Sequence, residues 1–186
     1  VTKNVADMVL ADDNFATIVS AVEEGRRIYD NIRKSIQFLL SSNLAEVFAI
    51  FVATLLGFTV LKPVHLLWIN LITDCFPALA LGMERAEADI MQRKPRDAKE
   101  GIFAGGMGFD VAFQGILIAA MTLFAYFTGH FIESGVWEIA SSADGITMAF
   151  LTLSMTEIFH SFNMRSRTQS VFKIKGHNKV LWGAMA

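Results

Sequence analysis

Residues 35–58 carry a single acid and no base, and this stretch constrains the fold more than any other feature of the chain. About 20 apolar residues are enough for a helix to cross the hydrocarbon core of a bilayer. Upstream, residues 15–34 alternate charged and apolar side chains with no helix breaker except Gly25, and Asp13 or Asn14 can cap the start. We therefore expect one long helix over 15–58, a water-facing stalk that continues into a membrane.

Three further apolar segments, at 64–82, 109–128 and 146–163, have the length of membrane spans, and another begins at 180–186. The chain is 53% hydrophobic and contains 16 Phe, which is unusual for a water-soluble domain. The sequence therefore predicts an all-α membrane protein, a polytopic helical bundle with one long helix extending from a stalk into the membrane.

The loops between these segments differ in charge. Lys and Arg gather in 83–108 and 164–179, whereas 129–145 carries acids and neither Lys nor Arg. Because cytoplasmic loops of membrane proteins are enriched in Lys and Arg, we expect the stalk and both basic loops to be cytoplasmic. The net charge of −2 gives no basic field, so no nucleic-acid partner is expected.

Polar side chains occur inside three of the predicted spans, at helical spacings that place each group on one face. Facing one another, they would supply three carboxylates, two amide carbonyls and a hydroxyl. Such an all-oxygen set suits a hard cation such as Ca²⁺, whereas zinc or copper sites use His or Cys. The candidate ligands are Asn43, Glu46, Asn70, Thr73, Asp74 and Glu157.

Carboxylates in a poorly solvated site repel one another, so we expect some of them to be protonated when no ion is bound. Ion binding would then release protons, which is a route to counter-transport. Pro77 cannot donate a hydrogen bond to the carbonyl of Thr73, so the helix should kink or unwind beside Asp74. Discontinuous helices at mid-membrane commonly form ion sites.

A structural interpretation stands beside this one. Intramembrane Asn and Thr often only form hydrogen bonds between helices, and this reading applies to Asn43, Asn70 and Thr73 taken singly. Carboxylates inside a membrane are costly and are seldom without function, which favours a functional role for Glu46, Asp74 and Glu157.

Two stretches, "DMVLADDNFATIVSAVEEGRRIYDNIRKSIQFLLSSNLAEV" and "LLWINLITDCFPALALGME", resemble the C-terminal part of P-type cation-transporting ATPases. The resemblance is closest to bacterial calcium pumps related to the sarcoplasmic reticulum pump. It implies that residues 1–14 are the tail of the cytoplasmic phosphorylation domain and that 15–58 are the stalk plus the fifth membrane helix. Membrane helices six, seven and eight would be 64–82, 109–128 and 146–163, and 180–186 would start helix nine. The loops 83–108 and 164–179 would be cytoplasmic, and the loop 129–145 would be extracytoplasmic.

The resemblance also implies roles for the polar residues. Asn43 and Glu46 match the fifth-helix ligands of the family, Glu157 matches the eighth-helix ligand, and the sixth-helix ligands are matched by Asn70, Thr73 and Asp74. The transported ion would be Ca²⁺, exported from the cytoplasm in exchange for protons across a bacterial plasma membrane. Na⁺ or Mn²⁺ transport by the same class of pump, and a non-catalytic module whose polar residues only link helices, are the alternatives.

The motifs that perform ATP hydrolysis in this family are not found in the chain, which has neither "DKTGT" nor "TGDGVND". We therefore expect the 186-residue chain to be non-catalytic by itself. ATP and Mg²⁺ would be required by other domains of the parent protein. The expected partners are the lipid bilayer, the transported cation and counter-transported protons, and the N-terminal membrane helices and cytoplasmic head of the same protein.

Overall fold

The computed structural model describes residues 5–6, 8–12, 14–97, 99–167, 169–171, 174 and 178–185. The predicted segments 1–14, 83–108, 164–179 and 180–186 therefore lie partly outside the described residues. Every element in the described part is helical, and none is a strand, so the predicted all-α fold class is confirmed. The elements are α1 (Phe15–Leu56), α2 (Pro63–Trp68), the π-helix η2 (Ile69–Asp74), α3 (Cys75–Gly82), α4 (Met107–Ser134), α5 (Ala143–Asn163) and α6 (Lys179–Ala184).

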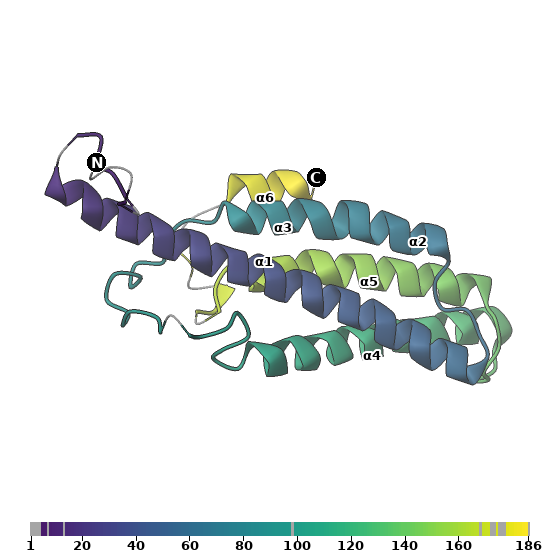
Figure 1. Ribbon diagram of the computed structural model, residues 1–186. Coiled ribbons are helices and arrows are strands. Elements are labelled where there is room, and N and C mark those ends of the chain that lie inside the picture. Colours follow the sequence, from purple (N-terminus) through teal and green to yellow (C-terminus); the bar gives the residue numbers. More distant parts are fainter. Residues whose placement is uncertain are drawn as a thin grey trace.

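Helix α1 is unbroken over 42 residues and extends past the other helices at its N-terminal end (Figure 1). At 1.5 Å per residue it is about 63 Å long, roughly twice the thickness of the hydrocarbon core. The Asn14 side chain caps its start by accepting a hydrogen bond from the backbone N–H of Ala16. Gly57 ends it at φ 81°, in the left-handed region that favours glycine.

The elements α2, η2 and α3 form one continuous helical rod from Pro63 to Gly82 (Figure 1). The backbone beside Asp74 widens into a π-helix instead of unwinding. Pro77 lies three residues after this segment, and its missing N–H removes one i→i−4 hydrogen bond of a regular α-helix. The sequence predicts that the helix kinks or unwinds beside Asp74, and the structure has a wide π-helical turn at this place instead.

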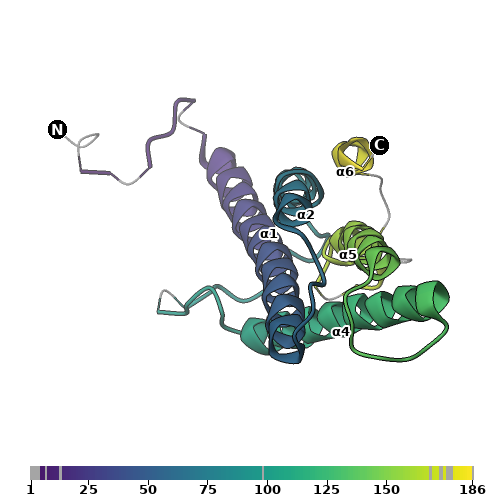
Figure 2. The same ribbon diagram turned by 90° about the vertical axis from the view of Figure 1, so that its right-hand side faces the viewer.

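The helices pack as a bundle in which α4 contacts both α1 and α5, while the α2–α3 rod contacts α1 and α5 (Figures 1 and 2). The core between them combines small residues of α1 with large ones from its neighbours. Its fully buried members include Ala45, Ala49, Ile69, Tyr126 and Leu153. Small side chains on α1 let the other helices approach closely, which is common in membrane bundles.

Three helical stretches are long and apolar enough to cross a membrane: Phe15–Leu56, Pro63–Gly82 and Met107–Ser134. Helix α5 is not among them, because it carries Glu157, His160 and several hydroxyl side chains. Its buried residues include those two, whereas Leu151, Met155 and Phe159 are exposed at successive turns. Helix α5 therefore has a polar buried face and an apolar outer face.

Gly129 of α4 lies directly against the start of α5. A Cβ atom there would meet the carbonyl oxygen of Asp144 at 2.8 Å and Gly145 at 2.9 Å, both backbone groups. We expect Gly129→Ala to destabilise the α4–α5 pair by about 1–3 kcal/mol, since the backbone of α5 must shift.

Gly108 of the same helix is the matched control, because a Cβ atom there meets nothing within 4 Å. Thermal unfolding of the detergent-solubilised protein should show a lower midpoint for Gly129→Ala and no loss for Gly108→Ala. Equal midpoints for the two variants would contradict the close approach of α4 to α5.

Candidate ion-binding site

Five of the six predicted ligands lie together where α1, η2 and α5 meet. Asp74 and Glu157 have no exposed surface, and Glu46 and Thr73 are 6% and 7% exposed. Each comes from a helix that packs against the other two. The cluster therefore holds three carboxyl groups inside the bundle, which is costly unless they are paired, protonated or bound to a cation.

Ser42 of α1, one turn before Glu46, joins two of the carboxyl groups. Its Oγ lies 2.8 Å from Oδ1 of Asp74 and 2.5 Å from Oε1 of Glu157. The hydroxyl of Thr73 lies 2.9 Å from Oε2 of Glu157 and 3.0 Å from the carbonyl oxygen of Ile69. Sequence reasoning did not select Ser42, although its i−4 spacing from Glu46 places it on the same face of α1.

Protonated carboxyl groups would complete these contacts. A Ser or Thr hydroxyl has one hydrogen to donate, and each of these two hydroxyls has two acceptor oxygens within hydrogen-bonding distance. If Ser42 donates to Asp74, a carboxyl proton of Glu157 completes its second contact. The geometry therefore accommodates a shared proton between the Ser42 hydroxyl and Glu157.

Glu46 makes a different contact. Both of its carboxylate oxygens accept hydrogen bonds from Nδ2 of Asn70, at 3.1 and 2.9 Å. The same amide also lies 3.0 Å from the carbonyl oxygen of Leu66. Asn70 thus presents its donor group to Glu46, and its amide oxygen would have to turn inward to bind a cation.

The polar side chains of the π-helix η2 contact two different helices. Asn70 and Asp74 contact α1, while Thr73 contacts α5. The wide turn of a π-helix is frequent at functional sites. It lets one short segment hold side chains toward two different helices.

Asn43 is the predicted ligand that the structure does not bring into the cluster. Its side chain is exposed and donates to the carbonyl oxygen of Leu39, one turn back on α1, at 2.7 Å. A ligand role for Asn43 requires its side chain to turn away from that carbonyl.

Within the described residues, no three His, Cys, Asp or Glu side chains lie close enough together to hold a metal ion. The carboxyl groups are joined through Ser42, Thr73 and Asn70 instead. Oδ2 of Asp74 is nevertheless buried with no hydrogen-bond partner. A buried acceptor without a donor is destabilising, and a cation would satisfy it.

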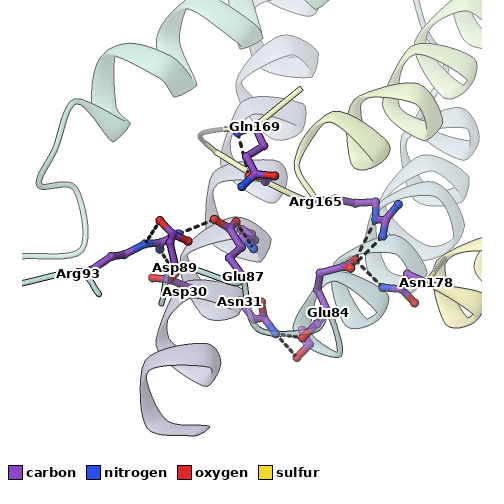
Figure 3. A network of polar contacts seen from close by, with 12 residues as sticks. Asp30, Asn31, Glu84, Glu87, Asp89, Arg93, Arg165, Gln169 and Asn178 are labelled. Atoms are coloured by element: carbon purple, nitrogen blue, oxygen red, sulfur yellow. Dashed lines mark hydrogen bonds and ion pairs between the residues drawn. The ribbon is translucent and has the colours of Figure 1, made fainter. Parts of the chain in front are cut away.

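A second polar network joins the ends of the helices that lie beside the stalk part of α1 (Figure 3). Arg165, just after α5, forms two hydrogen bonds of 3.0 Å to Glu84, just after α3, and both side chains are 8% exposed. Asn178, which caps α6, donates to the same carboxylate at 2.9 Å.

Two further ion pairs join the stalk part of α1 to the segment after α3. Lys34 of the stalk pairs with Glu87 at 3.0 Å, and Asp30 of the stalk pairs with Arg93 at 2.6 Å.

Opposing effects determine the pKa of Glu84. Burial raises it, but the hydrogen bonds from Arg165 and Asn178 and the charges of Arg165 and Lys34 lower it more, so the pKa lies below its ordinary value. The pKa of Glu87 is likewise lowered, because Lys34 and Arg93 outweigh the effect of burial. Both carboxylates are therefore charged at neutral pH. Glu87 pairs with Lys34 of the stalk, and Glu84 joins the end of α3 to Arg165 and Asn178.

Residues 58–186 match the family described as cation transporting ATPase, C-terminus. The chain belongs to this family. It is 48% identical over 185 residues to "Calcium-transporting ATPase 1" of Bacillus cereus, an alignment that covers 94% of this chain and 21% of that protein. It is 42% identical over 186 residues to "Calcium-transporting ATPase" of Bacillus subtilis, covering 100% of this chain and 20% of that protein.

The chain thus spans about a fifth of the length of the curated relatives it matches. The resemblance to the C-terminal part of P-type cation pumps is confirmed. Together with the three apolar helices, membership in this family identifies the chain as part of a multi-pass membrane protein.

Proposed function

We propose that this chain supplies most of the intramembrane ligands of an ATP-driven pump that exports Ca²⁺ from the cytoplasm in exchange for protons. The observation that carries the proposal is the burial of Glu46, Asp74 and Glu157, which come from three different packed elements, with Ser42 in contact with both Asp74 and Glu157. Helix-linking residues need no such concentration of acid, because Asn, Ser and Thr perform that task at lower cost.

Calcium is the ion favoured by the chemistry of the cluster. All the side-chain atoms that could face an ion are carboxylate, amide and hydroxyl oxygens, which Ca²⁺ binds in sets of about six to eight. The named calcium-transporting relatives support the same choice. Na⁺ and Mn²⁺ also bind oxygen ligands, so pumps of the same class for those ions remain the competing proposals.

ATP hydrolysis with Mg²⁺ belongs, in this proposal, to parts of the parent protein outside this chain. The chain contributes the ligands and the stalk that connects them to the cytoplasmic side. Ser42 and Glu46 lie on the same helix as Asp30 and Lys34, which bond to the 83–106 segment. A displacement of α1 would therefore move two cluster residues relative to η2 and α5.

The ion is identified by the cation that stimulates phosphoenzyme formation from ATP and Mg²⁺ in the purified full-length parent. The proposal expects stimulation by Ca²⁺ at concentrations at which Na⁺ and Mn²⁺ have no effect. Stimulation by Na⁺ or Mn²⁺ and not by Ca²⁺ would contradict calcium as the transported ion and identify the stimulating ion in its place. The absence of a phosphoenzyme with any of the three would contradict the pump.

Proton counter-transport has its own expected result. Because buried carboxyl groups that repel one another favour the protonated form when no ion is bound, calcium binding should release protons from the cluster. A pH-indicating dye in weakly buffered solution at pH 7 should report acidification when Ca²⁺ is added to the full-length protein.

Glu157→Gln should reduce the number of protons released per calcium ion bound, since the amide side chain has no proton that ionises near neutral pH. Glu133→Gln is the matched control, because Glu133 lies at the C-terminal end of α4, outside the cluster, and contacts Ser142. An unchanged proton yield in Glu157→Gln would contradict the assignment of the shared proton to this cluster.

A further inference from the structure

A cleft with an excess of positive charge lies between the stalk part of α1 and the 90–100 segment, away from the carboxyl cluster. It has a volume of 590 Å³ and is lined by residues of α1 from Val22 to Arg33 and of the loop from Ile90 to Glu100. Ligand pockets in proteins are usually about 300–1,000 Å³. The cleft is therefore large enough for a phosphate group with part of the molecule that carries it.

Five cations line the cleft and two carboxylates accompany them, those of Asp30 and Glu100. The cations are Arg26, Arg33, Arg93, Lys94 and Arg96. Arg93 is neutralised by ion pairs with Asp30, Glu87 and Asp89. In the part of the chain that the structure describes, none of the other four forms an ion pair.

Three of these unpaired cations are held in place by neutral groups. Arg26 donates to the carbonyl oxygens of Ile90 and Arg93 at 2.8 and 2.9 Å, and Arg33 donates to that of Ala104. The guanidinium of Arg96 lies over the ring of Tyr29, 4.1 Å from its centre. A guanidinium has five N–H donors, so each retains donors for an anion, and Arg matches the oxygens of phosphate in pairs.

The cleft lies next to the point where the stalk part of α1 gives way to its apolar part. Arg33 and Lys34 are the last basic residues of α1 before its apolar part, and the stalk from Val22 to Arg33 extends about 16 Å from them. A headgroup layer is only roughly 5–8 Å thick, so the cleft opens both to lipid headgroups and to the water beyond. Anionic lipids of the cytoplasmic leaflet attract Lys and Arg at this position.

We propose that this cleft binds a phosphate group, carried either by an anionic lipid headgroup or by a soluble phosphate compound. The carbonyl-anchored guanidinium groups of Arg26 and Arg33 form its fixed wall. Lys94 and Arg96, which are exposed, form its outer wall. The site is independent of the identity of the transported ion.

The test uses the full-length protein with the outer wall neutralised, Lys94→Gln/Arg96→Gln. The control is Lys99→Gln, which removes one positive charge from an exposed position of the same segment that does not line the cleft. One arm measures retention of phosphatidylglycerol by native mass spectrometry after reconstitution with phosphatidylcholine and phosphatidylglycerol. The other measures binding of inorganic pyrophosphate by titration calorimetry in neutral detergent.

We expect the double variant to bind either phosphatidylglycerol or pyrophosphate about tenfold more weakly, because each cation near an anionic surface contributes about fivefold in affinity before screening by salt. Loss in the first arm alone identifies a lipid headgroup, and loss in the second identifies a soluble phosphate compound. Equal binding by the double variant and Lys99→Gln in both arms would overturn the proposal. The proposal would also be overturned if neither phosphatidylglycerol nor pyrophosphate bound the unaltered protein.

Discussion

Replacing Asp74 by Asn in the full-length protein is expected to lower the apparent calcium affinity by at least about 100-fold. The substitution preserves the shape of the side chain but removes a charge, and calcium affinity depends strongly on the number of charged ligands. Asp74 is fully buried, and its Oδ2 has no hydrogen-bond partner. The dependence of phosphoenzyme formation on calcium concentration measures the effect.

The matched control for this substitution is Asp144→Asn, at the exposed start of α5. It makes the same chemical change in a helix that contributes to the cluster, about three and a half turns from Glu157. Its calcium dependence should equal that of the unaltered protein. If Asp74→Asn behaved like Asp144→Asn, the cluster would be a helix-linking network and the alternative of a non-catalytic module would gain support.

Arg165→Met is expected to destabilise the protein by about 3–5 kcal/mol, the usual cost of breaking one side of a buried ion pair. The substitution leaves the Glu84 carboxylate buried with Asn178 as its remaining side-chain donor. This carboxylate joins the ends of α3, α5 and α6 (Figure 3). The midpoint of thermal unfolding and the yield of folded protein in detergent measure the loss.

Arg167→Met provides the matched control, since Arg167 pairs with Asp110 at 3.4 Å where the two side chains are 22% and 43% exposed. Exposed pairs contribute only about 0–1 kcal/mol, so its midpoint should change little. The double variant Glu84→Gln/Arg165→Met should recover part of the loss, because no unpaired charge remains buried. Equal midpoints for Arg165→Met and Arg167→Met would contradict the structural role of the Glu84 pair.

The same ion pair has a defined dependence on pH. The pKa of Glu84 is lower in the folded protein than its ordinary value of 4.5, so its contribution is present above that value and is lost as the pH falls through the folded-state pKa. The difference in midpoint between the unaltered protein and Arg165→Met should therefore be largest near neutral pH and should narrow below pH 4.5.

The all-helical fold could be predicted because few other structures satisfy a long apolar stretch that holds a single acid. Residues 35–58 must satisfy their backbone hydrogen bonds internally in a membrane, and a helix does so. The burial of Glu46, Asp74 and Glu157 on facing helices could be expected from the sequence, since an acid in a membrane is costly unless it lies inside the bundle. Their role as ion ligands stays a prediction.

Other features depend on packing that no local pattern encodes. Ser42 is one of several Ser residues on α1, and only the approach of η2 and α5 makes it the link between two carboxyl groups. The Glu84–Arg165 pair joins residues 81 positions apart in the sequence. Asn43 has the spacing of a ligand, yet the rotation of α1 leaves its side chain exposed.

Equilibrium binding of radioactive calcium to the purified full-length protein is the most direct test of the proposed ion site. The proposal predicts binding at free calcium concentrations on the order of 10⁻⁶ M that is lost in Glu46→Gln, Asp74→Asn and Glu157→Gln and retained in Asp144→Asn. Calcium binding of undiminished affinity and amount in all three cluster variants would contradict it.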